Sequence, residues 1–174
     1  MNPLVPFVIP IRGLFPGQHD YTFDIDASFF EQFEHSPIKD GKVKVELMLI
    51  KQPDMYVLQF DFEGTVKTDC DRCLVPIDLP IFGEEQLLVK FSLEETSEEA
   101  EVIFISPEAP KLSVAKYIYE FICLSVPIIK TYDCLADEPP PCDEGMLAYL
   151  DTAESQDEPG NSVWDELKKL KGDN

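Results

Sequence analysis

The chain has 174 residues, with 14 basic and 34 acidic side chains and a formal net charge of −20. This length builds one sizeable core but is short for two independent domains, and the 44% hydrophobic content argues against general disorder. Because so negative a field repels phosphate and attracts basic partners, the charge argues against a purely electrostatic nucleic-acid binder.

The N-terminal stretch MNPLVPFVIPIRG is apolar, but it lacks the basic start of a signal peptide. Pro3, Pro6 and Pro10 interrupt any helix there, so the stretch is predicted to be an extended strand. No apolar run of the sequence reaches the length that spans a membrane. We therefore expect a soluble, cytoplasmic protein whose five cysteines are reduced or hold a metal.

The first regular pattern is a short alternation of apolar and polar residues at positions 21–25, which predicts a strand. Asp26 follows it and is a suitable N-cap for a helix. Phe29, Phe30 and Phe33 fall on one face of that helix, so we expect this face to pack against the core.

Two longer alternating runs, residues 42–51 and 58–66, flank a Pro-Asp turn and predict a long antiparallel hairpin. A further run at residues 75–81 predicts that the chain turns back once more. Cys70 and Cys73 lie between the last two runs, separated by two residues. This spacing lets a tight turn direct both sulfur atoms to one point, so the second hairpin ends in a Cys-x-x-Cys knuckle.

The second half of the chain has two shorter alternating runs, residues 87–93 and 102–105, around an acidic loop. A helix is predicted from Ser113 to just before Pro127. Its buried stripe has helical spacing and consists of Val114, Tyr117, Ile118, Phe121 and Ile122. Periodicity then disappears over residues 131–160, where we expect a constrained loop with one helical turn near Met146.

Four cysteines are candidate ligands of a structural zinc ion: Cys70, Cys73, Cys134 and Cys142. A structural zinc ion is usually bound by four ligands in a tetrahedral arrangement, which come as two pairs from separate segments. The first pair has the expected spacing, whereas seven residues separate the second pair. The alternative is that these are free thiols. The remaining cysteine, Cys123, lies just off the helical stripe and is interpreted as apolar filling.

A redox function is a weaker interpretation of the knuckle. A reactive Cys-x-x-Cys usually sits at a helix N-terminus, which lowers the pKa of the first thiol. Here the pair joins two strands, and the carboxylates of Asp69 and Asp71 lie beside it in sequence. Neighbouring carboxylates raise a thiol pKa, which disfavours a nucleophilic cysteine. No other catalytic motif stands out, so we expect a protein that is not an enzyme.

The C-terminal stretch predicts a last helix, capped by Asn161 or Ser162. Trp164, Leu167 and Leu170 project from one side and are the candidate partner-binding residues, because Trp between aliphatic side chains is typical of binding hot spots. The alternative is that the same face packs on the chain's own sheet. Packing on the chain's own sheet is favoured, because an exposed apolar stripe with Trp promotes aggregation.

These patterns predict an α+β fold, with a mainly antiparallel curved sheet or partial barrel, two or three helices and the Cys-x-x-Cys knuckle. Residues 1–150 are expected to form a single β-rich domain that contains the knuckle. Residues 151–160 are expected to form an acidic linker, and residues 161–174 the C-terminal helix.

The C-x-R-C-L knuckle at residues 70–74 is followed by the segment LSVPI at residues 124–128 and by the closing element VWDELKKL at residues 163–170. Together these three ordered motifs resemble the YceD-like family of large ribosomal RNA subunit accumulation proteins. Members of that family place further cysteine or histidine ligands after the second motif. Cys134 and Cys142 occupy this region here without the compact spacing usual in the family, and Gly160-Asn161 stands where the family has Asp-Pro. These departures weigh against the zinc site more than against membership of the family.

The resemblance implies a non-enzymatic assembly factor that supports the accumulation of large-subunit ribosomal RNA. At a net charge of −20, we expect it to act through protein contacts. The expected partner is a basic ribosomal protein or a large-subunit precursor, with indirect rRNA contact and with neither a membrane nor a small-molecule substrate. The alternatives are a generic acidic chaperone or adaptor and, less favoured, a thiol-disulfide oxidoreductase.

Overall fold

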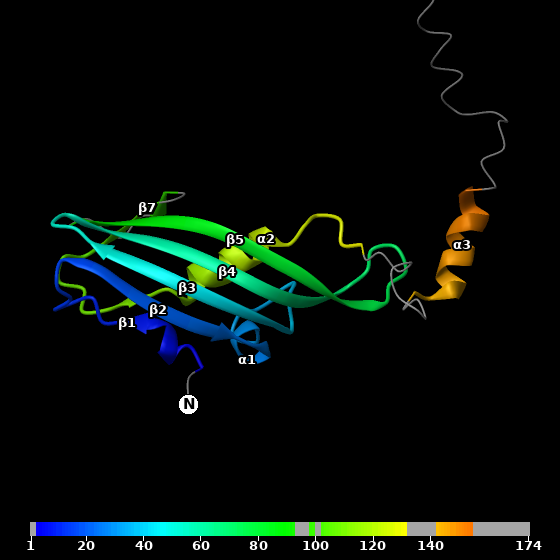
Figure 1. Ribbon diagram of the computed structural model, residues 1–174, viewed down its shortest axis with the longest axis horizontal. Coiled ribbons are helices and arrows are strands. Elements are labelled where there is room, and N and C mark those ends of the chain that lie inside the picture. The colour runs from blue at the N-terminus through cyan, green and yellow to red at the C-terminus, as the bar shows by residue number, and fades with distance from the viewer. Residues whose placement is uncertain (1–2, 93–97, 100–101, 132–141, 155–174) are drawn as a thin grey trace, which may run out of the picture.

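The computed structural model describes residues 3–92, 98–99, 102–131 and 142–154. Its main feature is a six-stranded sheet in the order β2-β3-β4-β5-β7-β6, next to a small two-stranded sheet of β1 and β8 (Figure 1). The elements are η1 (Val5–Phe7), β1 (Val8–Ile9), β2 (Gly17–Ile25), α1 (Ala27–Phe30), β3 (Gly41–Lys51), β4 (Met55–Asp69), β5 (Pro76–Phe91), β6 (Glu98–Glu99), β7 (Val102–Ile105), β8 (Leu112–Ser113), α2 (Ala115–Ser125) and α3 (Glu144–Glu154).

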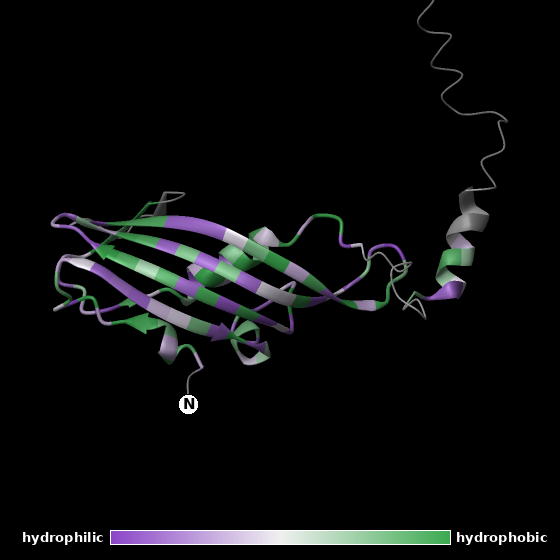
Figure 2. Ribbon diagram, in the orientation of Figure 1, coloured by the Kyte–Doolittle hydropathy of each residue, from purple (hydrophilic) through white to green (hydrophobic). Residues whose placement is uncertain are grey.

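The predicted hairpins form the centre of the sheet. Strands β3 and β4 pair antiparallel along their length, with Leu47 opposite Phe60, and β4 pairs in the same way with β5. Burial along β3 alternates residue by residue, as the sequence pattern predicts, and Figure 2 shows the matching alternation of colours along the strands. A one-residue shift in register would turn the whole apolar set toward solvent, so this alternation fixes the pairing.

The sheet is mainly antiparallel, as predicted, and it is open. Strands β2 and β6 are its two edges in the described part of the chain, so it does not close into a barrel. The pairing of β5 with β7 is parallel, because the chain returns to β5 after the segment that contains β6. The α+β class is confirmed, and its main sheet is open.

One face of the sheet carries the hydrophobic core, and α2 lies across it behind the long strands (Figure 1). Phe60, at the middle of β4, meets Phe121 of α2 edge to face, with ring centroids 5.2 Å apart. Phe33, which follows α1, stacks on Tyr119 of α2 at 3.9 Å. Within the described residues the core contains no charged or polar side chain, so apolar burial and aromatic contacts hold α2 to the sheet.

Several predicted boundaries are wrong. The N-terminal stretch is not one strand: Pro6 falls in the 3-10 turn η1, and only Val8–Ile9 pair with β8. Helix α1 has the predicted cap, since the Asp26 carboxylate accepts from the Ser28 N–H, but it ends at Phe30. The two runs at residues 75–81 and 87–93 are one strand up to Phe91, because β4 continues to pair with it through Gly83.

The loop predicted for residues 131–160 contains an eleven-residue helix, α3, which extends the expected helical turn through position 150 and into the predicted linker. Asp143 supports its first turn, because its carboxylate accepts from the Met146 N–H at 3.0 Å. The predicted C-terminal helix, with Trp164, Leu167 and Leu170, lies outside the described residues. Across the described ranges, no helix is both long and apolar enough to cross a membrane.

One glycine allows β3 and β4 to approach closely near the knuckle end of the hairpin. A Cβ atom added to Gly64 would lie 2.1 Å from the Lys42 carbonyl oxygen and 2.6 Å from Cα of Val43. Both atoms belong to the backbone of the facing strand, so no side-chain rotation relieves the clash. Glycine is therefore required here by the strand pairing itself.

Candidate functional site: the knuckle and the open face of the sheet

The knuckle joins β4 to β5 as a compact turn with both thiols turned inward. Cys70 and Cys73 are 0% and 2% exposed and belong to the hydrophobic core cluster. The turn is closed by two backbone bonds: the Cys70 N–H donates to the Val75 carbonyl, and the Leu74 N–H donates to the Cys70 carbonyl, each at 2.9 Å. Leu74 has a φ of 59°, a left-handed conformation that lets the chain reverse immediately after the second cysteine.

The knuckle is also clamped to the segment that follows α2. The Asp71 N–H donates to the Lys130 carbonyl, and the Lys130 N–H donates to the Asp71 carboxylate, each at 2.7 Å. The Lys130 ammonium lies 3.5 Å from the other carboxylate oxygen. The clamp therefore holds Lys130, which precedes Cys134 by four residues in the sequence, at the tip of the hairpin.

Replacing Asp71 is expected to weaken this clamp without unfolding the sheet, because only the backbone bond to the Lys130 carbonyl is kept. In Asp71→Ala, the Lys130 N–H loses its acceptor and the ion pair disappears, so the Lys130 amide should exchange about tenfold faster, which corresponds to about 1.4 kcal/mol. Hydrogen exchange followed by mass spectrometry of the peptide around Lys130 measures this. Asp69→Ala is the matched control, because the Asp69 carboxylate has no hydrogen bond or ion pair within the described residues. Equal exchange in both variants would contradict the clamp.

Three of the four cysteines predicted to bind zinc, Cys70, Cys73 and Cys142, lie in the described residues. Cys142 packs against the core cluster that contains Cys70 and Cys73. It is disulfide-bonded, whereas Cys70, Cys73 and Cys123 are not part of a disulfide. A disulfide and zinc coordination are alternative uses of the same sulfur atom, because zinc binds the thiolate. Cys134 lies outside the described residues, and within those residues no three Cys, His, Asp or Glu side chains gather closely enough for a metal.

The other groups considered for the site have structural surroundings. Burial raises the pKa of the Cys123 thiol, which is half-buried beside Tyr119 on α2, as expected for apolar filling. His19 donates through Nε2 to the Phe15 carbonyl at 2.8 Å. His35 adopts a φ of 59° in the turn after α1. None of these three side chains lies at the knuckle.

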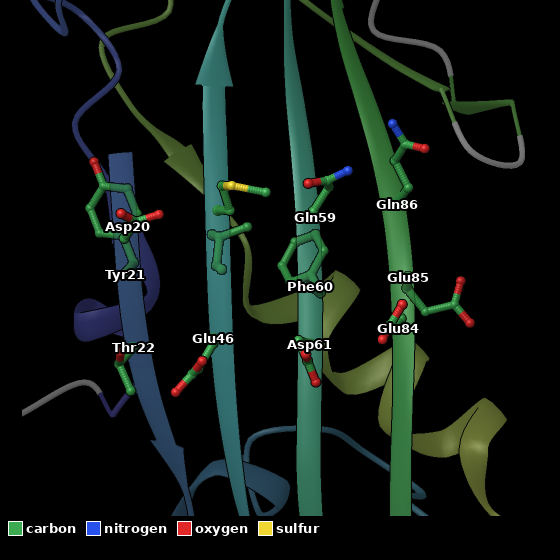
Figure 3. Close-up of a pocket in the computed structure, with 12 residues that line it drawn as sticks. Asp20, Tyr21, Thr22, Glu46, Gln59, Phe60, Asp61, Glu84, Glu85 and Gln86 are labelled. Carbon is green, nitrogen blue, oxygen red and sulfur yellow. The ribbon is translucent and has the colours of Figure 1, made fainter. Parts of the chain in front are cut away.

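A second candidate site is the face of β2–β5 that points away from α2, here called the open face. Figure 3 shows its centre, which forms a shallow hollow of about 670 Å³. The strand register places Glu46, Asp61 and Glu84 directly side by side on β3, β4 and β5, and Figure 3 shows them at one level. Adjacent strands are about 4.8 Å apart, so three carboxylates form a row across the sheet.

The row is only partly neutralised. Lys44 donates to the Glu46 carboxylate at 2.6 Å along the same strand. This contact, followed by the charge of nearby Glu63 and Asp24, raises the pKa of the Lys44 ammonium. Asp61 and Glu84 have no hydrogen bond or ion pair within the described part of the chain. Directly opposed like charges destabilise a sheet by about 0.2–1 kcal/mol per pair, so the row is costly unless a cation covers it.

Apolar side chains border the acidic row on the open face. Phe82 lies opposite Glu63 and is 81% exposed. In the other direction along β4, four residues from Asp61 and beyond Gln59, Val57 pairs with Ile50 and Leu88. Val57 is 8% exposed although it points away from the core face. The open face therefore offers a band of negative charge with an exposed aromatic ring at one end.

Sequence reasoning missed the open face because the row exists only in the paired sheet. The three residues of the row are widely separated in the sequence: Glu46, Asp61 and Glu84. Taken alone, each has the pattern of a solvent-exposed residue in an alternating strand. The signal that identifies them is the register, which depends on the length of two turns. By contrast, the knuckle was found because its two cysteines lie within one turn of chain.

The chain was compared with known proteins. The sequence model of a family described as "Large ribosomal RNA subunit accumulation protein YceD" matches residues 58–171, about two thirds of the chain. The match begins in β4 and includes the knuckle, β5, α2 and the C-terminal motif. No curated protein and no solved structure was found to match.

Proposed function

Because the chain belongs to the YceD family of large ribosomal RNA subunit accumulation proteins, we propose that it supports this accumulation by binding, without catalysing a reaction. The bound partner is a basic ribosomal protein or a precursor of the large subunit that carries one, and the protein acts in the cytoplasm. The observation that carries the proposal is the family match over residues 58–171, which includes the knuckle.

The charge of the molecule supports a protein partner over bare RNA. Acidic side chains outnumber basic ones by 34 to 14, and both halves of the sequence are net negative. A surface of this charge gains nothing from releasing the counterions of RNA, but it attracts the lysine- and arginine-rich segments of ribosomal proteins. Contact with rRNA is therefore made indirectly, through the bound protein.

The surroundings of the knuckle argue for a structural role and against thiol-disulfide exchange. A nucleophilic cysteine needs an accessible thiolate, and Cys70 and Cys73 are both buried at strand ends. Two buried cysteines in one turn are typical ligands of a structural zinc ion. Cys134 and Cys142 are the further proposed ligands. Zinc would fasten the sheet to the segment after α2, in addition to the Asp71–Lys130 clamp.

The C-terminal motif is proposed to contribute to partner binding through Trp164, Leu167 and Leu170. The family match extends to residue 171 and so includes this stretch. Its Lys168, Lys169 and Lys171 stand apart from the acidic bulk of the chain. If the motif packs on its own domain instead, its replacement will lower stability and leave partner capture unchanged.

Removal and capture test the proposed function. In cells that lack the gene, we expect the ratio of large- to small-subunit rRNA to fall and to recover when the wild-type chain is supplied. Untagged protein captured from growing cells with an antibody is expected to bring down large-subunit precursors and at least one basic ribosomal protein. An unchanged rRNA ratio would contradict the proposed function. Capture of basic proteins by a protein that does not sediment with large-subunit precursors would also contradict it, and would identify the protein as a generic acidic adaptor.

A further inference from the structure

We infer that the open face of β2–β5 is the docking surface for a lysine- or arginine-rich protein segment, which lies on the row Glu46, Asp61 and Glu84. This inference rests on the proposed function, which supplies the class of partner, and it names the surface that function uses. The opposite face of the same strands is covered by α2 and the core, so the open face is the one left without a packing element in the described chain.

The charges of the open face select a cationic occupant. Alongside the row, Asp20, Asp24 and Glu63 point to the same side of the sheet. The lysines of this face are Lys42 and Lys44 near the row, and Lys67 and Lys90 toward the strand ends. Lys44 is already bound to Glu46. The row therefore retains the uncompensated carboxylates of Asp61 and Glu84 at its centre, and a basic side chain placed above them would pair with both.

A solvated face of an ordinary antiparallel sheet has a different pattern. Cross-strand neighbours there are usually mixed in sign or neutral, because directly opposed like charges destabilise the pairing. Here three carboxylates are in register on three consecutive strands, and Phe82 is 81% exposed next to them. A lysine or arginine side chain can pack its methylene groups on the aromatic ring. Its charged group then reaches the neighbouring carboxylates.

The dimensions of the face suit a single segment of chain rather than a folded domain. The hollow holds about 670 Å³ and is lined by the middle of four strands. Phe82 is exposed on one side of the acidic row along the strands, whereas Val57 on the other side is buried. A segment that runs along the strands therefore meets acidic groups and then an aromatic ring, which favours basic residues followed by an apolar one.

The test uses a charge-matched pair of triple variants of the full chain. The first, Glu46→Gln/Asp61→Asn/Glu84→Gln, neutralises the row. The control, Glu31→Gln/Glu34→Gln/Asp54→Asn, removes three exposed carboxylates outside the open face, so both variants change the net charge equally. The probe is a fluorescent peptide of alternating lysine and leucine, and its affinity is measured by anisotropy at low and at moderate salt. Circular dichroism confirms that both variants are folded.

We expect the first variant to bind the peptide at least tenfold more weakly than the wild type at low salt, and the control to differ by less than about threefold. Peptide-induced NMR shifts should cluster on residues 44–48, 59–63 and 82–86. Equal losses in the two variants, or shifts confined to other residues, overturn the inference. Binding of deproteinised rRNA that the first variant loses also overturns it, because the face would then recognise nucleic acid.

Capture from cells separates this inference from the proposed function. If the first triple variant still recovers large-subunit precursors as well as the wild type does, the function stands and the docking surface is wrong. If neither protein recovers precursors, the function fails, while the peptide measurement still reports on the surface. Recovery by the wild type and the control, but not by the first variant, supports both.

Discussion

Phe60→Ala is expected to lower the free energy of unfolding by about 3–5 kcal/mol, because truncating a buried phenylalanine loses apolar burial and leaves a cavity. Phe60 is 2% exposed at the centre of β4, between Leu47 of β3 and the strand β5. Its ring also meets Phe121 edge to face at 5.2 Å, so the substitution removes a contact that holds α2 on the sheet. Urea unfolding followed by far-ultraviolet circular dichroism measures the loss.

Phe82→Ala is the matched control for this prediction. Phe82 lies on the neighbouring strand β5 and is 81% exposed, so its truncation should change stability by less than about 0.5 kcal/mol. The same pair separates stability from binding, since Phe82 borders the acidic row of the open face. If Phe60→Ala costs less than about 1.5 kcal/mol, then α2 is not fastened through this contact.

The fold was predictable from sequence wherever burial alternates residue by residue. Val43, Val45, Leu47 and Leu49 alternate with Lys44, Glu46 and Met48. This pattern leaves one arrangement that buries the apolar set, and β3 adopts it. The ends of elements were less predictable, because pairing partners decide them. Strand β5 passes without a break through Gly83, which the Phe62 ring covers, although the apolar pattern lapses at Glu84, Glu85 and Gln86.

The candidate site was predictable only in its local part. Cys70 and Cys73 lie within one turn, so their spacing alone indicates a knuckle. The clamp between Asp71 and Lys130 joins residues 59 positions apart, and no local pattern marks either of them. The acidic row has the same origin, because it depends on a register that two separate turns establish. Long-range polar contacts of this kind depend on the fold, so they cannot be predicted from local sequence patterns.

Replacing Cys70 gives the second large effect, on the metal content of the protein. If Cys70, Cys73, Cys134 and Cys142 hold zinc, the wild-type chain purified under reducing conditions without a histidine tag should carry about one zinc ion. Cys70→Ser should carry less than about a tenth of that, because a serine hydroxyl is a poor zinc ligand. Elemental analysis by mass spectrometry measures both. Cys123→Ser is the matched control, since Cys123 is a free thiol on α2 away from the knuckle.

Stability with and without a chelator separates loss of zinc from loss of packing. Cys70 is fully buried, so a serine hydroxyl at its position costs about 1–3 kcal/mol even when no metal is involved. Because binding free energy of a structural zinc ion is folding free energy, a chelator should destabilise the wild type and Cys123→Ser but leave Cys70→Ser unchanged. A wild type that holds no zinc and ignores the chelator would contradict the zinc site. Its Cys142 sulfur would then serve the disulfide, and the Asp71–Lys130 clamp would hold the knuckle to the chain after α2 without a metal.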